Sequence, residues 1–300
     1  MYRILSSSLL LLLSLTLVPV ASAKVTIKMA TLAPVKSSWN RIFKKAAAEI
    51  KAQTGGEVIF RIYAGGSQGD EKKSVSKMRT NQLQAAAITA VGLGEIAPEI
   101  LILQAPRLIT SYRTLDRVRG KLKSRFENAL AAKGFVLLGW GDVGLTYVYS
   151  TTPVATPSDL KKTKLWVWRD DPIVRAIART IGTRGVPLSV PGVLGALNTN
   201  RVNAMIVSPL ACLQLQWCNH MKYRSPHPVN VGIGAMVVRS KALAQLKPEH
   251  LAIVKAVWAK YSRALVRKVR RDNARAAVIL REKKGIADTP VTPAAKAASA

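Results

Sequence analysis

The chain switches repeatedly between two spacings of its apolar residues. In residues 24–29 apolar side chains occupy every second position, which predicts a β-strand with one apolar face. From Trp39 to Ile50 apolar residues recur at helical spacing, behind serines that can cap a helix, and Gly55 and Gly56 end it. The first elements are therefore predicted to be one strand and one helix.

The same alternation continues along the chain. Further strands are predicted at 57–63, 83–90, 163–168, 185–190, 202–207 and 231–240, and two strand-like runs share 135–150 around Gly139, Gly141 and Gly144. Helices are predicted after the Gly-rich turn at 65–69, over 112–133, from Pro172 to Ile181 with Asp171 as N-cap, up to Asn198, and from Pro248 to about Lys284. These units predict an α/β fold, and the three glycines suit a bend between two lobes.

The amino-terminal segment has the pattern of an export signal. Arg3 precedes an apolar run from Leu9 to Val20, and Ala21 to Ala23 supplies the small residues of a cleavage site. Removing residues 1–23 from 300 leaves 277, enough for two lobes of about 100 to 150 residues each. We therefore expect a periplasmic protein.

Basic residues far outnumber acidic ones. The 46 lysines and arginines against 16 aspartates and glutamates give a net charge of +30, or +29 without Arg3. Nucleic acid is an unsuitable partner for an exported chain, whereas an anionic membrane surface, an acidic protein or a generally basic proteome fits this charge. Six cations on the last predicted helix point in several directions, which favours a solvated surface: Arg263, Arg267, Lys268, Arg270, Arg271 and Arg275. Weak binding to anionic vesicles at low salt is nevertheless expected.

The two cysteines, Cys212 and Cys218, are six residues apart in a predicted helix. In a continuous helix this separation places them on different faces, so it predicts two buried thiols rather than a disulfide. Together with His220 and His227 they match no common spacing of zinc ligands, so no metal site is expected.

Four stretches in a fixed order carry a family resemblance: TLAPVKSSWNRIFKKAAAEI, TGGEVIFRIYAGGSQGDE, TPSDLKKTKLWVW and LGALNTNRVNAMIVSPL. Over nearly all of the mature chain they resemble the solute-binding receptors of tripartite ATP-independent periplasmic (TRAP) transporters. The resemblance implies a two-lobed, type II-like periplasmic-binding-protein fold that closes on a small molecule and presents it to a membrane permease. It implies no catalysis and no cofactor.

The expected organisation follows from this resemblance. Lobe I is expected to comprise residues 24–145 and about 228–255, and lobe II residues 146–227. Residues 256–285 are expected to form a long helix bracing both lobes, and 286–300 a disordered tail that is too poor in bulky apolar residues to fold.

Three positions depart from the family's pattern. Trp166 stands where most members carry an arginine that grips a ligand carboxylate, Thr146 replaces a second arginine, and Ser208 replaces an asparagine. An indole offers an apolar surface and a single donor, so an apolar or aromatic-containing ligand is predicted, with an organic acid of that kind included. The predicted ligand-binding residues are Trp166, Trp168, Trp140, Thr146, Ser208, Arg169, Gly69 and Trp39. The alternative is that the tryptophans only pack into the core.

Two other functions stay open. One is a periplasmic lipid-shuttling or partner-binding protein on the same fold, and the chain looks closest to a receptor subgroup with a tetratricopeptide-repeat partner. The other is a serine hydrolase, because Gly65 to Gly69 matches the G-x-S-x-G motif with Ser67 as nucleophile. Against the hydrolase, no HGGG-like oxyanion loop is visible, and His220, His227 and His250 lie in poor contexts.

Overall fold

The computed structural model describes residues 24–290, so the predicted signal segment lies outside the described residues. The strands are β1 Val25–Thr31, β2 Val58–Tyr63, β3 Ala85–Thr89, β4 Phe135–Ser150, β5 Trp166–Trp168, β6 Val186–Leu188, β7 Ala204–Val207, β8 Tyr223–Arg224, β9 Asn230–Arg239 and β10 Ala287–Asp288. The α-helices are α1 Ser38–Gln53, α2 Glu71–Arg79, α3 Ala90–Ile96, α4 Tyr112–Lys121, α5 Lys123–Ala132, α6 Pro157–Lys161, α7 Pro172–Thr180, α8 Val193–Asn198, α9 Pro209–Gln214, α10 Ser240–Leu243 and α11 Pro248–Glu282. Short 3-10 helices are η1 Pro98–Gln104, η2 Val190–Gly192 and η3 Trp217–His220.

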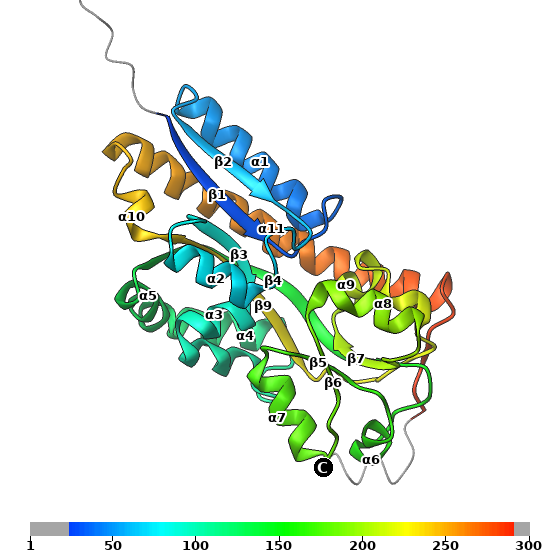
Figure 1. Ribbon diagram of the computed structural model, residues 1–300. Coiled ribbons are helices and arrows are strands. Elements are labelled where there is room, and N and C mark those ends of the chain that lie inside the picture. The colour runs from blue at the N-terminus through cyan, green and yellow to red at the C-terminus, as the bar shows by residue number, and fades with distance from the viewer. Residues whose placement is uncertain (1–23, 291–300) are drawn as a thin grey trace, which may run out of the picture.

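Most of these strands join one mixed sheet (Figure 1). Within residues 24–290 its order is β10-β8-β4-β9-β3-β1-β2, with β7 also beside β4. Strand β1 runs parallel to β2 and β3, whereas β9 is antiparallel to both β3 and β4. A separate pair of parallel strands, β5 and β6, connects to the main sheet through a bridge from Leu165 to Ala204.

Strand β4 is a single element of 16 residues, not the two separate runs that the glycines suggested. Its first part pairs with β9 and its last four residues pair with β7, so it continues through both halves of the molecule. Register shifts occur between Leu137 and Gly139 and between Asp142 and Gly144. A Cβ at Gly139 would collide with the side chain of Ser262 on α11, so this glycine lets the helix lie close against the strand.

Helix α11 is 35 residues long and confirms the predicted helix from Pro248. It packs against α1, β4 and α9, and Figure 1 shows it running along most of the molecule. Asn273 on its buried face donates to the carbonyl of Val143 at 2.9 Å and accepts from the N–H of Leu210 at 3.1 Å. The helix thereby ties β4 to α9.

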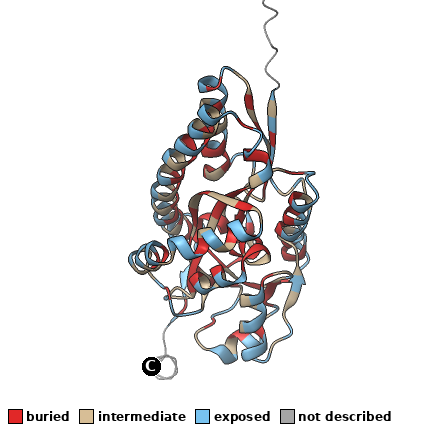
Figure 2. Ribbon diagram, turned by 90° about the vertical axis from the view of Figure 1, so that its left-hand side faces the viewer, coloured by how far each residue is buried: buried red, intermediate tan, exposed pale blue. Residues whose placement is uncertain are grey.

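Buried side chains are concentrated in the sheet and on the helix faces that cover it (Figure 2). One apolar cluster lies between β1, α1 and α11, with Trp258 against Phe43 and Phe60. Another lies between the sheet and α2 to α5. Among the described helices, none is both long and apolar enough to cross a lipid bilayer.

Two predicted segments differ from the structure. The expected helix over 112–133 breaks at Leu122 into α4 and α5. The expected tail begins later than residue 286, because β10 pairs in parallel with β8 and Asp288 forms an ion pair with Arg224 at 2.6 Å. Pairing with a distant strand orders these residues although they carry few bulky apolar groups. Residues 291–300 lie outside the described part of the chain.

The prediction of two free thiols is wrong, because Cys212 and Cys218 form a disulfide with a Cα–Cα distance of 5.2 Å. The two cysteines do not share a continuous helix. Helix α9 ends at Gln214, and Gln216 adopts a left-handed conformation with a φ of 63° before η3 begins. This turn folds the chain back and brings the sulfur atoms together.

Candidate functional site

A cavity of about 210 Å³ lies where the central sheet meets the segment from β5 to α7. Its wall is formed by the end of β1 and the start of α1, the end of β3, the middle of β4 and β9, β5 and the start of α7, and parts of α9, η3 and α11. Segments from distant parts of the chain therefore converge on one space. Such convergence between two lobes is typical of a ligand pocket.

All six tryptophans of the chain line this cavity: Trp39, Trp140, Trp166, Trp168, Trp217 and Trp258. Trp166 stacks on Trp168 with ring centroids 6.1 Å apart and meets Trp217 edge to face at 5.0 Å. Aromatic residues make up only 6% of the sequence, yet all of its tryptophans lie around this one cavity. Trp166, Trp217 and Trp258 are at most 5% exposed and pack into the apolar clusters, whereas Trp39, Trp140 and Trp168 are partly exposed and offer most of the aromatic surface.

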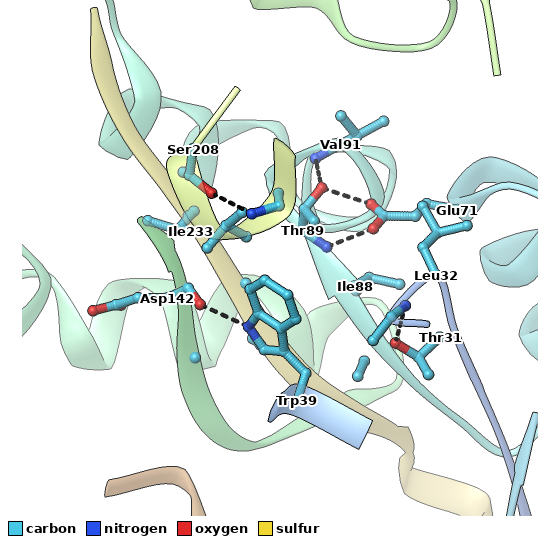
Figure 3. A pocket seen from close by; sticks show the side chains of 18 of the residues that line it. Thr31, Leu32, Trp39, Glu71, Ile88, Thr89, Val91, Asp142, Ser208 and Ile233 are labelled. Carbon is cyan, nitrogen blue, oxygen red and sulfur yellow. Dashed lines mark hydrogen bonds between the residues drawn. The ribbon is translucent and has the colours of Figure 1, made fainter. Parts of the chain in front are cut away.

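Three of the indole N–H groups are already bonded within the protein. Trp39 donates to the backbone carbonyl of Asp142 at 3.1 Å, as Figure 3 shows. Trp166 donates to the carbonyl of Leu188 at 3.2 Å, and Trp168 donates to Oδ2 of Asp70 at 3.0 Å. These bonds fix the orientation of the rings and occupy these three donors within the protein.

The charged residues of the wall are all acidic. Of the described residues that line the cavity, none is a lysine, an arginine or a histidine, and the charged ones are Glu71, Asp142 and Asp171. The chain as a whole has a net charge of +30. The cavity is thus a local exception to the protein's positive charge.

Glu71 opens α2 and is only 2% exposed. Its carboxylate accepts hydrogen bonds from the backbone and hydroxyl of Thr89, at 2.8 and 2.9 Å, and from the N–H of Gly92 at 2.8 Å. Figure 3 shows this carboxylate turned toward Thr89. Burial raises the pKa of Glu71 to about 7, although the three hydrogen bonds act in the opposite direction.

Asp142 is fully paired behind the cavity wall. Its carboxylate accepts from Arg119 at 2.9 Å and from Arg270 at 2.7 Å, and both guanidinium groups also bond to Asp116. These four side chains balance one another in charge. Asp142 therefore contributes its backbone carbonyl, rather than a free charge, to the surroundings of Trp39.

Asp171 is the N-cap of α7, as the sequence predicted. One carboxylate oxygen, Oδ1, accepts both N–H groups of the first helical turn, at 2.8 and 3.2 Å. The residue is 7% exposed, and burial raises the pKa of its carboxyl above the ordinary value. Unlike Asp142, it has no ion-pair partner within residues 24–290.

Six of the eight residues predicted to bind the ligand line the cavity: Trp166, Trp168, Trp140, Thr146, Ser208 and Trp39. Thr146 donates its hydroxyl to Asn230 at 2.6 Å, and Ser208 caps α9 by accepting from Ala211 at 3.3 Å. The side chains of Thr146 and Ser208 are therefore engaged within the protein. Ligand contact by all six stays a prediction.

Gly69 and Arg169 are not among the lining residues. Asp70 occupies the amino end of α2 and bonds to Trp168 and to the N–H of Val190, and at this helix end it is Glu71, not Gly69, that lines the cavity. Arg169 lies just beyond β5, where its N–H donates to the carbonyl of Leu188.

Glu71, Trp217 and Trp258 were not predicted as site residues. Only the strand-to-helix position of Glu71 offered a signal, since residues after strand ends often reach a cleft.

Ser67 does not have the surroundings of a hydrolase nucleophile. It lies in the turn between β2 and α2 and is not among the residues that line the cavity. Among the described residues, no hydrogen bond links its side chain to His220, His227 or His250, and His250 instead lies 3.6 Å from Glu57. The G-x-S-x-G match is thus accounted for by a turn before a helix.

Comparison with known proteins connects this architecture to a family. Residues 29–300 match the family DctP, described as bacterial extracellular solute-binding protein, family 7. A solute-binding protein of Chromohalobacter salexigens is 29% identical over 162 residues, which cover 52% of this chain and 47% of that protein. One from Albidiferax ferrireducens is 26% identical over 170 residues, covering 56% and 50%. The chain thus matches about half the length of these curated relatives.

Solved structures share the fold over nearly the whole chain. An extracytoplasmic solute receptor of Bordetella pertussis, described as binding pyroglutamic acid, is 20% identical with a TM-score of 0.84, covering 91% of this chain and 90% of that one. A TRAP periplasmic solute-binding protein of Pseudomonas putida F1 with bound D-glucuronate is 19% identical with a TM-score of 0.81, covering 92% and 90%. The predicted two-lobed α/β fold with its long helix is confirmed, and the chain belongs to the DctP family of bacterial extracellular solute-binding proteins.

Proposed function

We propose that this protein is the extracytoplasmic solute receptor of a TRAP transporter and that it traps an apolar or aromatic-containing small molecule in the cavity described above. The observation that carries the proposal is a cavity wall that contains six tryptophans and, among the described residues, no lysine, arginine or histidine. The receptor acts in the periplasm without catalysis and delivers its ligand to a membrane permease.

The chemistry of the wall argues against a simple carboxylate as ligand. A carboxylate is usually held by a guanidinium through two parallel hydrogen bonds. The family resemblance implies that Trp166 stands where most members carry that arginine, and the charged residues among the described wall residues are acidic. Small organic acids are bound by the two solved receptors described above. We expect this chain to differ from them in ligand class.

Aromatic surface supplies the affinity instead. Burying an aromatic ring of the ligand removes apolar area from water at about 25 cal/mol per Å², so a ring that is covered on both faces contributes a few kcal/mol. The wall has such surfaces on more than one side, because the partly exposed rings of Trp39, Trp140 and Trp168 come from α1, β4 and β5.

Contacts between α2 and the β5–β6 segment suit trapping by lobe closure. Oδ2 of Asp70 accepts from the indole of Trp168 at 3.0 Å and from the N–H of Val190 at 3.1 Å. Lys72 adds a longer ion pair to Asp170 at 3.9 Å. Closure that forms these bonds would bury the ligand, and their rupture would release it to the permease.

The test is to identify what the protein retains when it is purified without added ligand. Native mass spectrometry is expected to show an apolar or aromatic adduct, and the same compound should raise the melting temperature of the stripped protein. Small carboxylates such as pyroglutamate and glucuronate should leave it unchanged. Stabilisation by those acids alone would overturn the assignment of ligand class.

Further partners belong to the same proposal. A tetratricopeptide-repeat protein would receive the ligand from the receptor or load it. The adduct distinguishes the receptor from a lipid-shuttling protein, because a shuttle would retain a membrane-derived lipid. The serine hydrolase alternative is tested with the Ser67→Ala variant. This variant and the unaltered protein should hydrolyse ester substrates at the same rate.

A further inference from the structure

The cavity wall combines aromatic faces with buried carboxylates that have no cationic partner. We propose that the ligand carries a positively charged organic ammonium group attached to its apolar or aromatic body. This inference rests on the proposed receptor function and narrows its ligand class.

Asp171 is the clearest observation behind the proposal. Both helix-capping bonds are accepted by its Oδ1 atom, and within the part of the chain that the structure describes its Oδ2 atom has no partner. The residue lines the cavity while being 7% exposed. A buried carboxylate without an opposite charge is costly, and a ligand cation would supply that charge.

Glu71 adds a second carboxylate from a different element. It belongs to α2, whereas Asp171 precedes α7, and both line the same cavity. Its three hydrogen bonds come from neutral donors on Thr89 and Gly92, and no ion pair involves it among the described residues. Burial raises the pKa of both carboxyls, as expected for acids that lack a neighbouring cation.

The tryptophans suit the same ligand. Ammonium groups are attracted to the face of an aromatic ring, and tryptophan is the strongest of the natural partners. The N–H groups of Trp39, Trp166 and Trp168 are bonded to the protein, which holds these rings in place. Aromatic walls with adjacent carboxylates are a suitable environment for quaternary ammonium groups.

Asp142 differs from Asp171 and Glu71 because its carboxylate has ion-pair partners within the protein. It lines the same cavity, yet its oxygens are neutralised by Arg119 and Arg270 at 2.9 and 2.7 Å. The protein thus supplies cations to one wall carboxylate and leaves two for the ligand. The positive charge of the remaining surface acts on an incoming cation only weakly, because the screening length is about 8 Å at physiological ionic strength.

Three probes of similar size separate charge from shape. Phenyltrimethylammonium and tert-butylbenzene have the same shape and differ in charge, and benzoate is the anionic counterpart. Binding to the stripped full-length mature protein in 150 mM salt is followed by tryptophan fluorescence and titration calorimetry. The cation is expected to bind at least about tenfold more tightly than its neutral isostere, because desolvated cation–π and carboxylate contacts add to the same apolar burial. Benzoate is expected to bind most weakly.

The variant Asp171→Asn tests the carboxylate directly. Asparagine caps helices about as well as aspartate, so α7 keeps its start while the charge is removed. Affinity for phenyltrimethylammonium should fall about tenfold and affinity for tert-butylbenzene should not change. Asp159→Asn is the matched control, since Asp159 also lies at the start of a helix, α6, but does not line the cavity. Glu71→Gln provides a second variant with the same expected selectivity change at pH 8, where the carboxyl of Glu71, with its pKa of about 7, has lost its proton.

The outcomes distinguish this inference from the proposed function. Equal affinity of the unaltered protein for the cation and its neutral isostere overturns the ammonium ligand and leaves the apolar receptor intact. Preference for benzoate overturns both. If none of the three probes binds, the ammonium ligand is again overturned, and the retained adduct decides the proposed function separately.

Discussion

At the scale of single residues, the cavity wall consists of side chains whose polar atoms are mostly committed inside the protein. The indole N–H groups of Trp39, Trp166 and Trp168 are bonded, and Thr146 donates to Asn230. The remaining chemistry is that of ring faces and buried carboxylates. Single substitutions here should therefore act through buried area, one hydrogen bond or one charge, and each effect can be measured separately.

Glu71 should make the stability of the protein depend on pH. Burial raises the pKa of its carboxyl from 4.5 to about 7 in the folded state, so between these two values the folded protein holds a proton that the unfolded chain has lost. The free energy of unfolding should accordingly fall as the pH rises from 4.5 to 7, by about 3 kcal/mol from this group, and should change little above 7.

Urea unfolding of the unaltered protein and of Glu71→Gln at pH 4.5, 6 and 7.5 measures this contribution as the difference between them. Glu127→Gln, at a solvent-facing carboxylate on α5, is the control for a change of net charge. A difference between the first two proteins that stays constant over this range would contradict the account of Glu71.

Comparison of two tryptophans measures how much the hydrogen bond of an indole N–H contributes to the free energy of unfolding. Trp166 donates to Leu188, whereas the N–H of Trp258 is buried and has no partner among the described residues. Replacement by phenylalanine shortens both rings equally but removes a hydrogen bond only at Trp166. Trp166→Phe is expected to lower the free energy of unfolding by about 1 kcal/mol more than Trp258→Phe, measured by chemical denaturation. A larger loss at Trp258 would show that ring packing outweighs the N–H at these sites.

At the scale of elements, the disulfide segment determines where one wall of the cavity lies. Helix α9 and η3 are joined by the turn at Gln216 and closed by the bond between Cys212 and Cys218. Trp217 lies inside this loop and packs edge to face on Trp166. The covalent link thus restrains a ring that lines the cavity.

Removing the disulfide should destabilise the protein modestly, because the loop is short. The chain-entropy relation for a loop of seven residues gives about 2 kcal/mol. The double variant Cys212→Ser and Cys218→Ser should lose this amount in chemical denaturation, and a reductant should have the same effect on the unaltered protein. The variant itself should not respond to the reductant. A reductant effect of equal size on both would exclude the disulfide as its cause.

Elements with local signals were the ones that the sequence predicted well. Ser37 caps α1 and Asp171 caps α7 through their own side chains, and Pro248 begins α11. The break at Leu122 follows Gly120, a glycine that the prediction of one helix over 112–133 passed over, and the turn at Gln216 uses a left-handed conformation that the residue type does not announce. Strand β10 exists only through pairing with β8, so no local pattern could reveal it.

The same distinction holds for the site. Trp166 and Trp168 were predictable because they alternate on a short strand that ends at the cleft. Glu71 was not, since its burial depends on Thr89 and Gly92, which belong to the next strand and helix. Trp258 lies on α11, which is distant in the sequence from the other wall elements.

At the scale of the whole molecule, charge is distributed unevenly between the cavity and the outer surface. The charged residues that line the cavity in the described part of the chain are all acidic, whereas the net charge of the chain is +30. On α11 two of the six cations are engaged, Arg270 with Asp116 and Asp142 and Lys268 with Asp272. The other four are exposed and follow one another at intervals of four residues: Arg263, Arg267, Arg271 and Arg275. These four form a stripe along α11, while Lys268 and Arg270 turn toward their acidic partners.

This stripe leads to a prediction about membranes. The protein without residues 1–23 should bind vesicles containing anionic lipid in about 10 mM salt, where the screening length is about 30 Å, and should dissociate near 0.5 M salt. A lysine or arginine near an anionic surface contributes about 1 kcal/mol, so changing all four exposed arginines to glutamine should weaken binding at least about tenfold in a sedimentation assay.

The control makes the same change at four exposed arginines that are dispersed over other elements: Arg113, Arg117, Arg175 and Arg201. Because both variants lose the same net charge, equal weakening would mean that the overall charge attracts the protein and that α11 has no special part. Binding that does not respond to salt would exclude electrostatic attraction altogether, whereas selective loss in the α11 variant would place this helix against the anionic membrane surface.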